Sequence, residues 1–116
     1  MSIETDLYTT LSGAAGVTSL VSTRIYPNRR PEGATKPAIE YSTIIGTRDS
    51  TLSGSGDLDH KMIQISCHAD TYASAKSVAQ AVYAALEGNG YQESEVDLYD
   101  WETQTHTVAL TWRFMA

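Results

Sequence analysis

A period-2 pattern of hydrophobic and polar residues runs directly into a helical pattern between residues 62 and 88. Ile63, Ile65 and Cys67 fall on one side of a predicted strand, with polar residues between them. Asp70 is placed to cap a helix, because its carboxylate can accept hydrogen bonds from the first turn, and Gly88 favours a C-terminal stop. The apolar positions of this helix recur every 3.6 residues: Tyr72, Ala75, Val78, Ala79, Val82, Tyr83 and Leu86.

Shorter patterns on both sides predict the remaining elements. Ser2 can cap a first helix with apolar positions Ile3, Leu7, Tyr8 and Leu11, and a second short helix is expected around residues 17–21. Residues 24–26 form a short extended piece that ends at a proline. Longer strands are expected at residues 37–45, 93–99 and 105–114.

The polar stretch at residues 46–59 is too long for a tight hairpin turn. Because well-patterned strands lie on either side, we expect it to form a long hairpin tip at about 46–60. Structureless loops of this length inside a compact domain are usually functional or disordered. The tip is therefore our best candidate for reaching across to a neighbouring subunit.

The order of elements is helix, strand pair, long helix, strand pair. This order predicts an α+β fold: a two-layer sandwich in which a four-stranded, mainly antiparallel sheet packs against the long helix and the N-terminal helix. Residues 1–116 are expected to form a single domain, since this length supports one modest core.

Composition narrows the possible functions. A formal charge of −6 argues against a protein that coats DNA, because such binding depends on lysines and arginines that displace counterions. The single cysteine, Cys67, excludes an internal disulfide and is expected in the core. No signal peptide or membrane-spanning pattern is recognisable, and we expect folding in a cytoplasm without membrane contact.

Candidate catalytic and metal sites are weak. Cys67 and His68 are adjacent on a strand, so their side chains point to opposite faces and cannot form a dyad. Asp57, Asp59 and His60 lack the oxygen ligands and spacing of a calcium loop. We therefore expect no enzyme activity, no cofactor and no metal site.

Two non-catalytic features suggest contacts with other subunits. Basic residues gather near residues 24–36 and acidic residues at 87–102, so that opposite patches could meet between neighbouring copies. The outer face of the long helix is small and uncharged, which would let another surface approach. The residues expected at such an interface are Arg24, Arg29, Arg30, Arg48, Asp49, Leu52, Leu58, Ala73, Gln80, Ala84, Glu95 and Asp97.

Residues 63–76, with the sequence IQISCHADTYASAK, resemble the small tail-completion proteins of long-tailed bacteriophages and prophages. Further segments of the chain follow the same family in the same order, so the resemblance covers nearly the whole chain. Each motif alone is short and mostly structural. The further segments are residues 3–8 (IETDLY), 23–27 (TRIYP), 37–41 (PAIEY), 97–99 (DLY) and 108–114 (VALTWRF).

The resemblance implies a structural virion protein at the head-proximal end of the tail. Subunits would form a ring, expected to be a hexamer, on the last ring of tail tube protein, stop tube growth and join the tail to the head connector protein. Genomic DNA would pass through the ring without specific binding, and assembly would take place in the host cytoplasm. The alternative is a small cytoplasmic α+β domain, dimeric, with a ligand-binding or regulatory role. A ligand pocket in it would be lined by Tyr99, Trp101 and Trp112.

Overall fold

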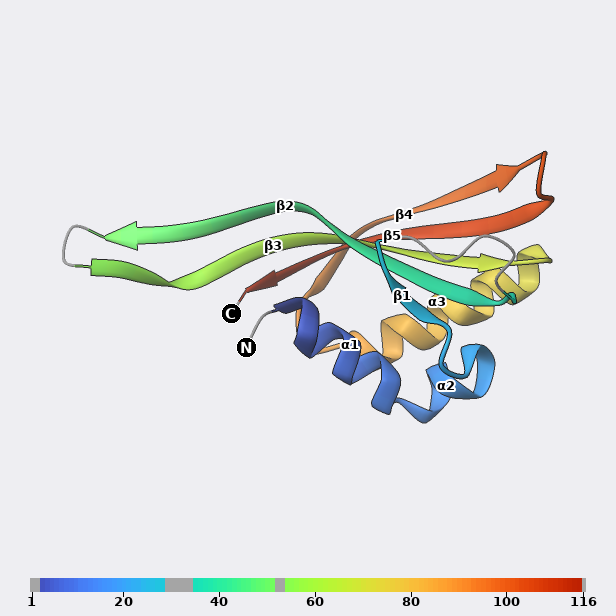
Figure 1. Cartoon of the computed structure of the whole chain (residues 1–116), viewed down its shortest axis with the longest axis horizontal. Coiled ribbons are helices and arrows are strands. Elements are labelled where there is room, and N and C mark those ends of the chain that lie inside the picture. Colours follow the sequence, from blue (N-terminus) through green and yellow to red (C-terminus); the bar gives the residue numbers. More distant parts are fainter. Residues whose placement is uncertain (1–2, 29–34, 52–53, 116) are drawn as a thin grey trace.

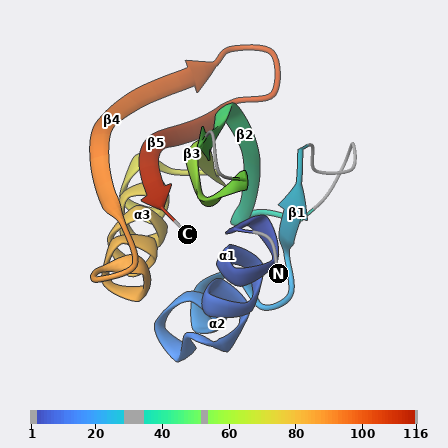
Figure 2. The same ribbon diagram turned by 90° about the vertical axis from the view of Figure 1, so that its left-hand side faces the viewer.

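The computed structural model describes residues 3–28, 35–51 and 54–115, with the backbone alone for 47–51, 54–60 and 115. The strands form one sheet of order β1-β2-β3-β5-β4, and the helices cover one of its faces (Figures 1 and 2). This arrangement confirms the α+β class. The elements are α1 (Ile3–Gly13), α2 (Ala15–Val21), β1 (Ile25–Pro27), β2 (Ala38–Thr51), β3 (Gly54–Ala69), α3 (Tyr72–Leu86), β4 (Tyr91–Asp100) and β5 (Thr105–Met115).

The expected four-stranded sheet is wrong in one respect, because the sheet has a fifth strand. The short extended piece after α2 is β1, which pairs parallel with β2 in the register Ile25 opposite Ile39. The other strand pairs are antiparallel. A three-residue strand carries almost no signal of its own, and its pairing depends on where α1 and α2 place the chain.

The core lies between the helices and the inner face of the sheet. The α3 helix buries one side against this face, as its 3.6-residue period predicts. Strands β3 and β5 supply most of the opposing layer, with Ile63 opposite Trp112 and Ile65 opposite Leu110. The fully buried large side chains are Leu11, Val17, Val21, Ile39, Ile63, Ile65, Val78, Val82, Leu86, Val108, Leu110 and Trp112.

The start of α3 differs from the sequence-based expectation. Thr71, and not Asp70, is the N-cap: its side chain accepts a hydrogen bond from the Ser74 amide at 3.2 Å. Asp70 forms an ion pair with Lys36 at 3.1 Å instead. Both residues can cap a helix, and the strand end at Ala69 decides which of them stands at the first turn.

In its described part, residues 46–51 and 54–59, the polar stretch forms the distal ends of β2 and β3. Its backbone forms an antiparallel ladder that continues to the pair Thr51–Gly54. Strand β5 accompanies β3 only from His60 onward, so β2 and β3 are the only described strands in the distal part of the hairpin. We call residues 46–60 the arm. The arm projects beyond the rest of the molecule (Figure 1). With the arm included, the molecule measures 52 × 28 × 23 Å along its principal axes.

A bulge at the base of the arm interrupts the alternation expected for β2. The register shifts between Thr43 and Ile45, so that Ile45 no longer faces the core. Ile44 and Ile45 are both exposed, with 47% and 55% of their surface accessible.

Candidate assembly surfaces

The arm is the first candidate surface, because no described helix or strand packs on it as a second layer. A two-stranded hairpin is at best marginally stable alone in water, and it gains stability from a third strand or a packed partner. Of the expected interface residues, Arg48 lies on β2 opposite Asp59 in the backbone register, and Asp49 lies at a register shift. The side chains of Arg48, Asp49 and Leu58 and the whole of Leu52 lie outside the described parts of the structure.

Strand β4 is the second candidate surface. It lies at the edge of the sheet and pairs with β5 alone among the described strands. Almost every residue of β4 is exposed. Val96 and Leu98 lie on the face of the sheet opposite the helices and are 48% and 52% exposed. An edge strand with exposed aliphatic residues is a template for pairing with another strand.

The interface list missed Val96, Leu98, Ile44 and Ile45. A sequence signal exists for the first two, because they alternate with Glu95 and Asp97 in a period-2 pattern. That pattern predicts that Val96 and Leu98 share one face of the strand. It does not predict that this face is exposed in the folded subunit. The sequence gives no signal for the exposure of Ile44 and Ile45, because two adjacent apolar residues do not predict a β-bulge.

Three acidic residues of β4, Glu93, Glu95 and Asp97, have cationic partners within the chain. Lys76 of α3 lies 2.7 Å from Glu95 and 2.8 Å from Asp97, and Arg113 lies 2.8 Å from Glu93. Hydrogen bonds from Lys76 and then Tyr72 lower the pKa of Asp97 below its ordinary value. Glu95 and Asp97 therefore face α3 of their own chain. Their negative charge is partly neutralised within the subunit, which the sequence alone did not predict.

The basic residues expected near 24–36 are only partly described by the structure. Arg24 donates hydrogen bonds to the Pro37 carbonyl at 2.9 Å and to the Leu20 carbonyl at 3.5 Å, so it holds α2 and the start of β2 together. The structure therefore gives Arg24 a role within the subunit. Arg29 and Arg30 lie outside the described residues.

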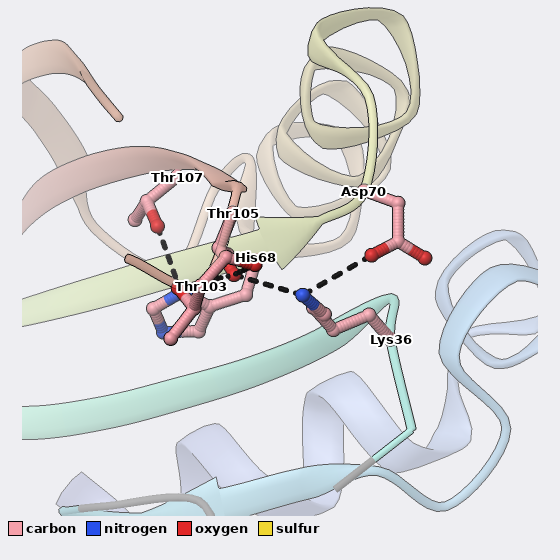
Figure 3. A network of polar contacts seen from close by, with 6 residues as sticks. All are labelled: Lys36, His68, Asp70, Thr103, Thr105 and Thr107. Carbon is pink, nitrogen blue, oxygen red and sulfur yellow. Dashed lines mark hydrogen bonds and ion pairs between the residues drawn. The ribbon is translucent and has the colours of Figure 1, made fainter. Parts of the chain in front are cut away.

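A polar network closes the end of the sandwich opposite the arm (Figure 3). Lys36 donates to the Thr105 hydroxyl at 2.8 Å and pairs with Asp70, joining the start of β2, the start of α3 and the turn before β5. Thr103 donates to the same Thr105 hydroxyl at 2.8 Å. These contacts hold three segments that are distant in the sequence, and they are structural.

His68 lies on the open face of the sheet beside this network. Its Nδ1 is 2.8 Å from the Thr107 hydroxyl, and its Nε2 faces the Glu40 carboxylate. Cys67 is buried on the opposite face, which confirms that the two cannot form a dyad. The His68 side chain is only 14% exposed between these neighbours.

In the described part of the chain, the open face of the sheet carries a shallow hollow of about 640 Å³, lined by residues of β3, β4 and β5 and by the β4–β5 turn. Trp101 contributes to it and is 83% exposed, with its ring against Tyr99 at 4.8 Å. Trp112 is buried on the other face under α3. Among the described residues, Tyr99 and Trp101 therefore line this hollow without Trp112, so the expected lining by all three aromatic residues is wrong.

The outer face of α3 is the third candidate surface. Ala73, Gln80 and Ala84 are exposed along it, as expected, and α3 carries one charged side chain, Lys76, between Tyr72 and Leu86. Tyr72 and Tyr83 also lie half-exposed at its edges, although the helical period placed them with the core residues.

The described residues offer little for other chemistry. Within residues 3–28, 35–51 and 54–115, no group of three or more His, Cys, Asp or Glu side chains could hold a metal ion. The side chains of Asp57, Asp59 and His60 are not described. None of the described helices has the length and apolar character needed to cross a membrane.

Comparisons with known proteins agree with this picture. A family model described as tail completion protein gp17 matches residues 5–116. Among solved structures, a chain of the virion of a native gene transfer agent particle superposes with a TM-score of 0.77 at 18% identity, covering 98% of this chain and 93% of that chain. No curated protein matches the sequence. Since the family model spans nearly the whole chain, the protein belongs to the tail completion gp17 family of structural phage tail proteins.

Proposed function

We propose that the protein assembles as a ring, a hexamer, on the head-proximal end of the tail tube. There it ends tube growth and joins the tail to the head connector protein. The family membership supports a structural role in the tail, and the likeness to a chain of a gene transfer agent virion supports a fold suited to that setting.

The arm is the observation that carries this proposal. Its distal ladder has no third strand and no covering layer among the described residues, so it gains most when another protein packs on it. An arm that leaves the body at one end can reach a neighbouring subunit or the tube beneath (Figure 1). A ring also requires a heterologous contact, in which two different surfaces of the subunit meet and the rotation closes.

The net charge is compatible with DNA passing through such a ring. A chain with a formal charge of −6 has little attraction for phosphates, so a moving duplex would not be held. In this role the contacts with tube, connector and neighbouring subunits supply the function, and no bond is made or broken.

Electron microscopy of particles from a phage or induced prophage lacking this gene tests the proposal. Filled heads beside unattached tails, or tails of abnormal length, are the expected result. Complementation with the intact gene should restore joined particles, which controls for effects on neighbouring genes. Normal infectious particles without the protein would overturn the proposed role.

A further inference from the structure

The sheet has two open edges on opposite sides. On one side is β4, which pairs only with β5. On the other side, β1 covers β2 only from Ile39 to Tyr41, so β2 is open from Ser42 to the arm tip at Thr51. The two open stretches are similar in length but lie at different levels, because β5 and β3 place β4 level with residues 38–45 of β2. The strands must therefore be inclined to the axis of the ring for the open stretch of one copy to reach β4 of the next. No described strand occupies either of them.

The exposed aliphatic side chains gather on these same edges. Among residues whose side chains are described, the exposed valine, leucine and isoleucine residues are Ile44, Ile45, Val96 and Leu98. The first two lie on the open part of β2 and the last two on β4. Exposed apolar side chains therefore lie on two different edges of the same subunit. In a ring, one edge of a subunit can contact the other edge of the next subunit and cover both sets of side chains.

Strand direction favours the same contact. Strand β2 is antiparallel to β3, β3 to β5, and β5 to β4, so β2 and β4 run in opposite directions within one chain. A rotation about an axis that runs roughly along the strands carries one copy onto the next and preserves strand direction. The neighbour's β2 therefore meets β4 antiparallel, the arrangement with perpendicular hydrogen bonds.

Charge does not oppose the pairing. Glu93, Glu95 and Asp97 of β4 are partnered by Arg113 and Lys76 of their own chain. The arm strand of β2 contributes Arg48 and Asp49, whose charges cancel. The edge contact therefore brings no large excess of like charge together.

We propose that the open edge of β2 in one copy pairs antiparallel with β4 of the next copy, joining the sheets continuously around the ring. This inference rests on the proposed ring. It names the surfaces that form the ring and the partner of the arm, which is a second copy of this chain. Backbone hydrogen bonds supply the attraction, and Ile44, Ile45, Val96 and Leu98 are covered on assembly.

Cysteine cross-linking in assembled tails tests the pairing. Double variants combine Ile44→Cys, Ile45→Cys or Thr47→Cys in β2 with Ser94→Cys, Val96→Cys or Leu98→Cys in β4. On oxidation, at least one register should give a ladder of covalent oligomers on a non-reducing gel, because paired strands bring Cβ atoms within disulfide reach. Cys67 is buried, so the native thiol contributes no background.

Two matched controls sharpen the result. Each single variant should stay monomeric on the gel, whereas covalent dimers from Val96→Cys alone would show that β4 pairs with β4 and would overturn the proposal. A β2 cysteine combined with Ser77→Cys, on the exposed side of α3, should give no ladder. A ladder from that pair would place the arm on α3 instead and would also overturn it.

Hydrogen exchange on the wild-type chain gives a second measurement that needs no variant. Amides in residues 42–51 and 91–100 should exchange about tenfold or more slowly in the ring than in the monomer. Rings that lack both this protection and the ladder would overturn the edge pairing and leave the ring itself intact. Tails that lack the protein altogether would overturn the ring and the pairing together.

Discussion

The Glu4 carboxylate of α1 binds the Lys61 ammonium of β3, with Nζ–Oε distances of 2.7 and 2.8 Å. The same carboxylate accepts a 2.6 Å hydrogen bond from the Thr43 hydroxyl of β2. Lys61 lies opposite Gly46, where the arm begins. One carboxylate thus ties the first helix to both strands at the base of the arm.

Replacing Glu4 with Gln should weaken this anchor. Burial raises the pKa of Glu4, but hydrogen bonds from Lys61 and Thr43 outweigh that effect and lower the pKa below its ordinary value of 4.5. A lowered pKa stabilises the folded state above the unfolded pKa, and the contribution is lost as the pH falls through the folded value. Because the carboxylate is partly exposed, we expect Glu4→Gln to cost about 1 kcal/mol at pH 7.

Denaturant unfolding of both proteins at several pH values measures this difference. The difference in unfolding free energy should stay constant above about pH 6 and shrink as the pH falls below 4.5. Subtraction of the two curves removes the other carboxylates. A difference that is independent of pH down to pH 2 would contradict the assignment.

Replacing Thr71 with Ala should destabilise the protein by about 1 kcal/mol, because the Ser74 amide loses its cap. In a domain of this size the loss lowers the melting temperature by roughly 4 °C. Asp70→Ala is the matched control. It removes only an exposed ion pair with Lys36 and should cost less. The reverse order of the two effects would make Asp70 the functional cap.

The Cys67 thiol should not react in the native protein. Burial raises its pKa to about 12, and the thiolate is the reactive form. A disulfide reagent such as DTNB at pH 8 should label less than a tenth of the chain in an hour, and one thiol per chain in guanidinium. Rapid labelling of the folded protein would show that the strand face opens readily.

Deleting residues 51–56 should leave the monomer folded and abolish assembly. The body keeps its core, because β5 pairs with β3 only from His60. Circular dichroism and thermal unfolding report the monomer, and native mass spectrometry or electron microscopy reports the ring. Leu52→Ser is a control that keeps the length of the arm and removes one apolar side chain. It tests whether assembly depends on this side chain or only on the length of the arm. Unchanged assembly after the deletion would remove the arm from the proposed interface.

Reversing Arg29 and Arg30 to Glu should weaken ring formation in a salt-dependent manner. A contact between opposite patches is screened as ionic strength rises, so the defect should be largest in low salt. The double change to Gln should give a smaller defect. Arg24→Glu is expected to differ, because it also breaks hydrogen bonds within the subunit and lowers the melting temperature. No effect of Arg29→Glu and Arg30→Glu at low ionic strength would contradict charge pairing.

Local patterns determined much of this protein. Periods of 2 and 3.6 residues predicted the β3–α3 unit and placed Cys67 inward, because side-chain direction follows from the backbone repeat alone. The same patterns predicted a hairpin between β2 and β3, although its polar residues concealed a regular ladder. Family resemblance over the whole chain agrees with the match to residues 5–116.

Tertiary structure determined how the predicted elements contact segments that are distant in the sequence. Only the packing of α1 and α2 brings β1 beside β2, and only the position of Lys76 partners Glu95 and Asp97. The exposure of Val96 likewise depends on the absence of a covering layer over β4. A sequence period states which side chains share a face. Which faces are covered, and by what, is set by contacts between residues far apart in the chain.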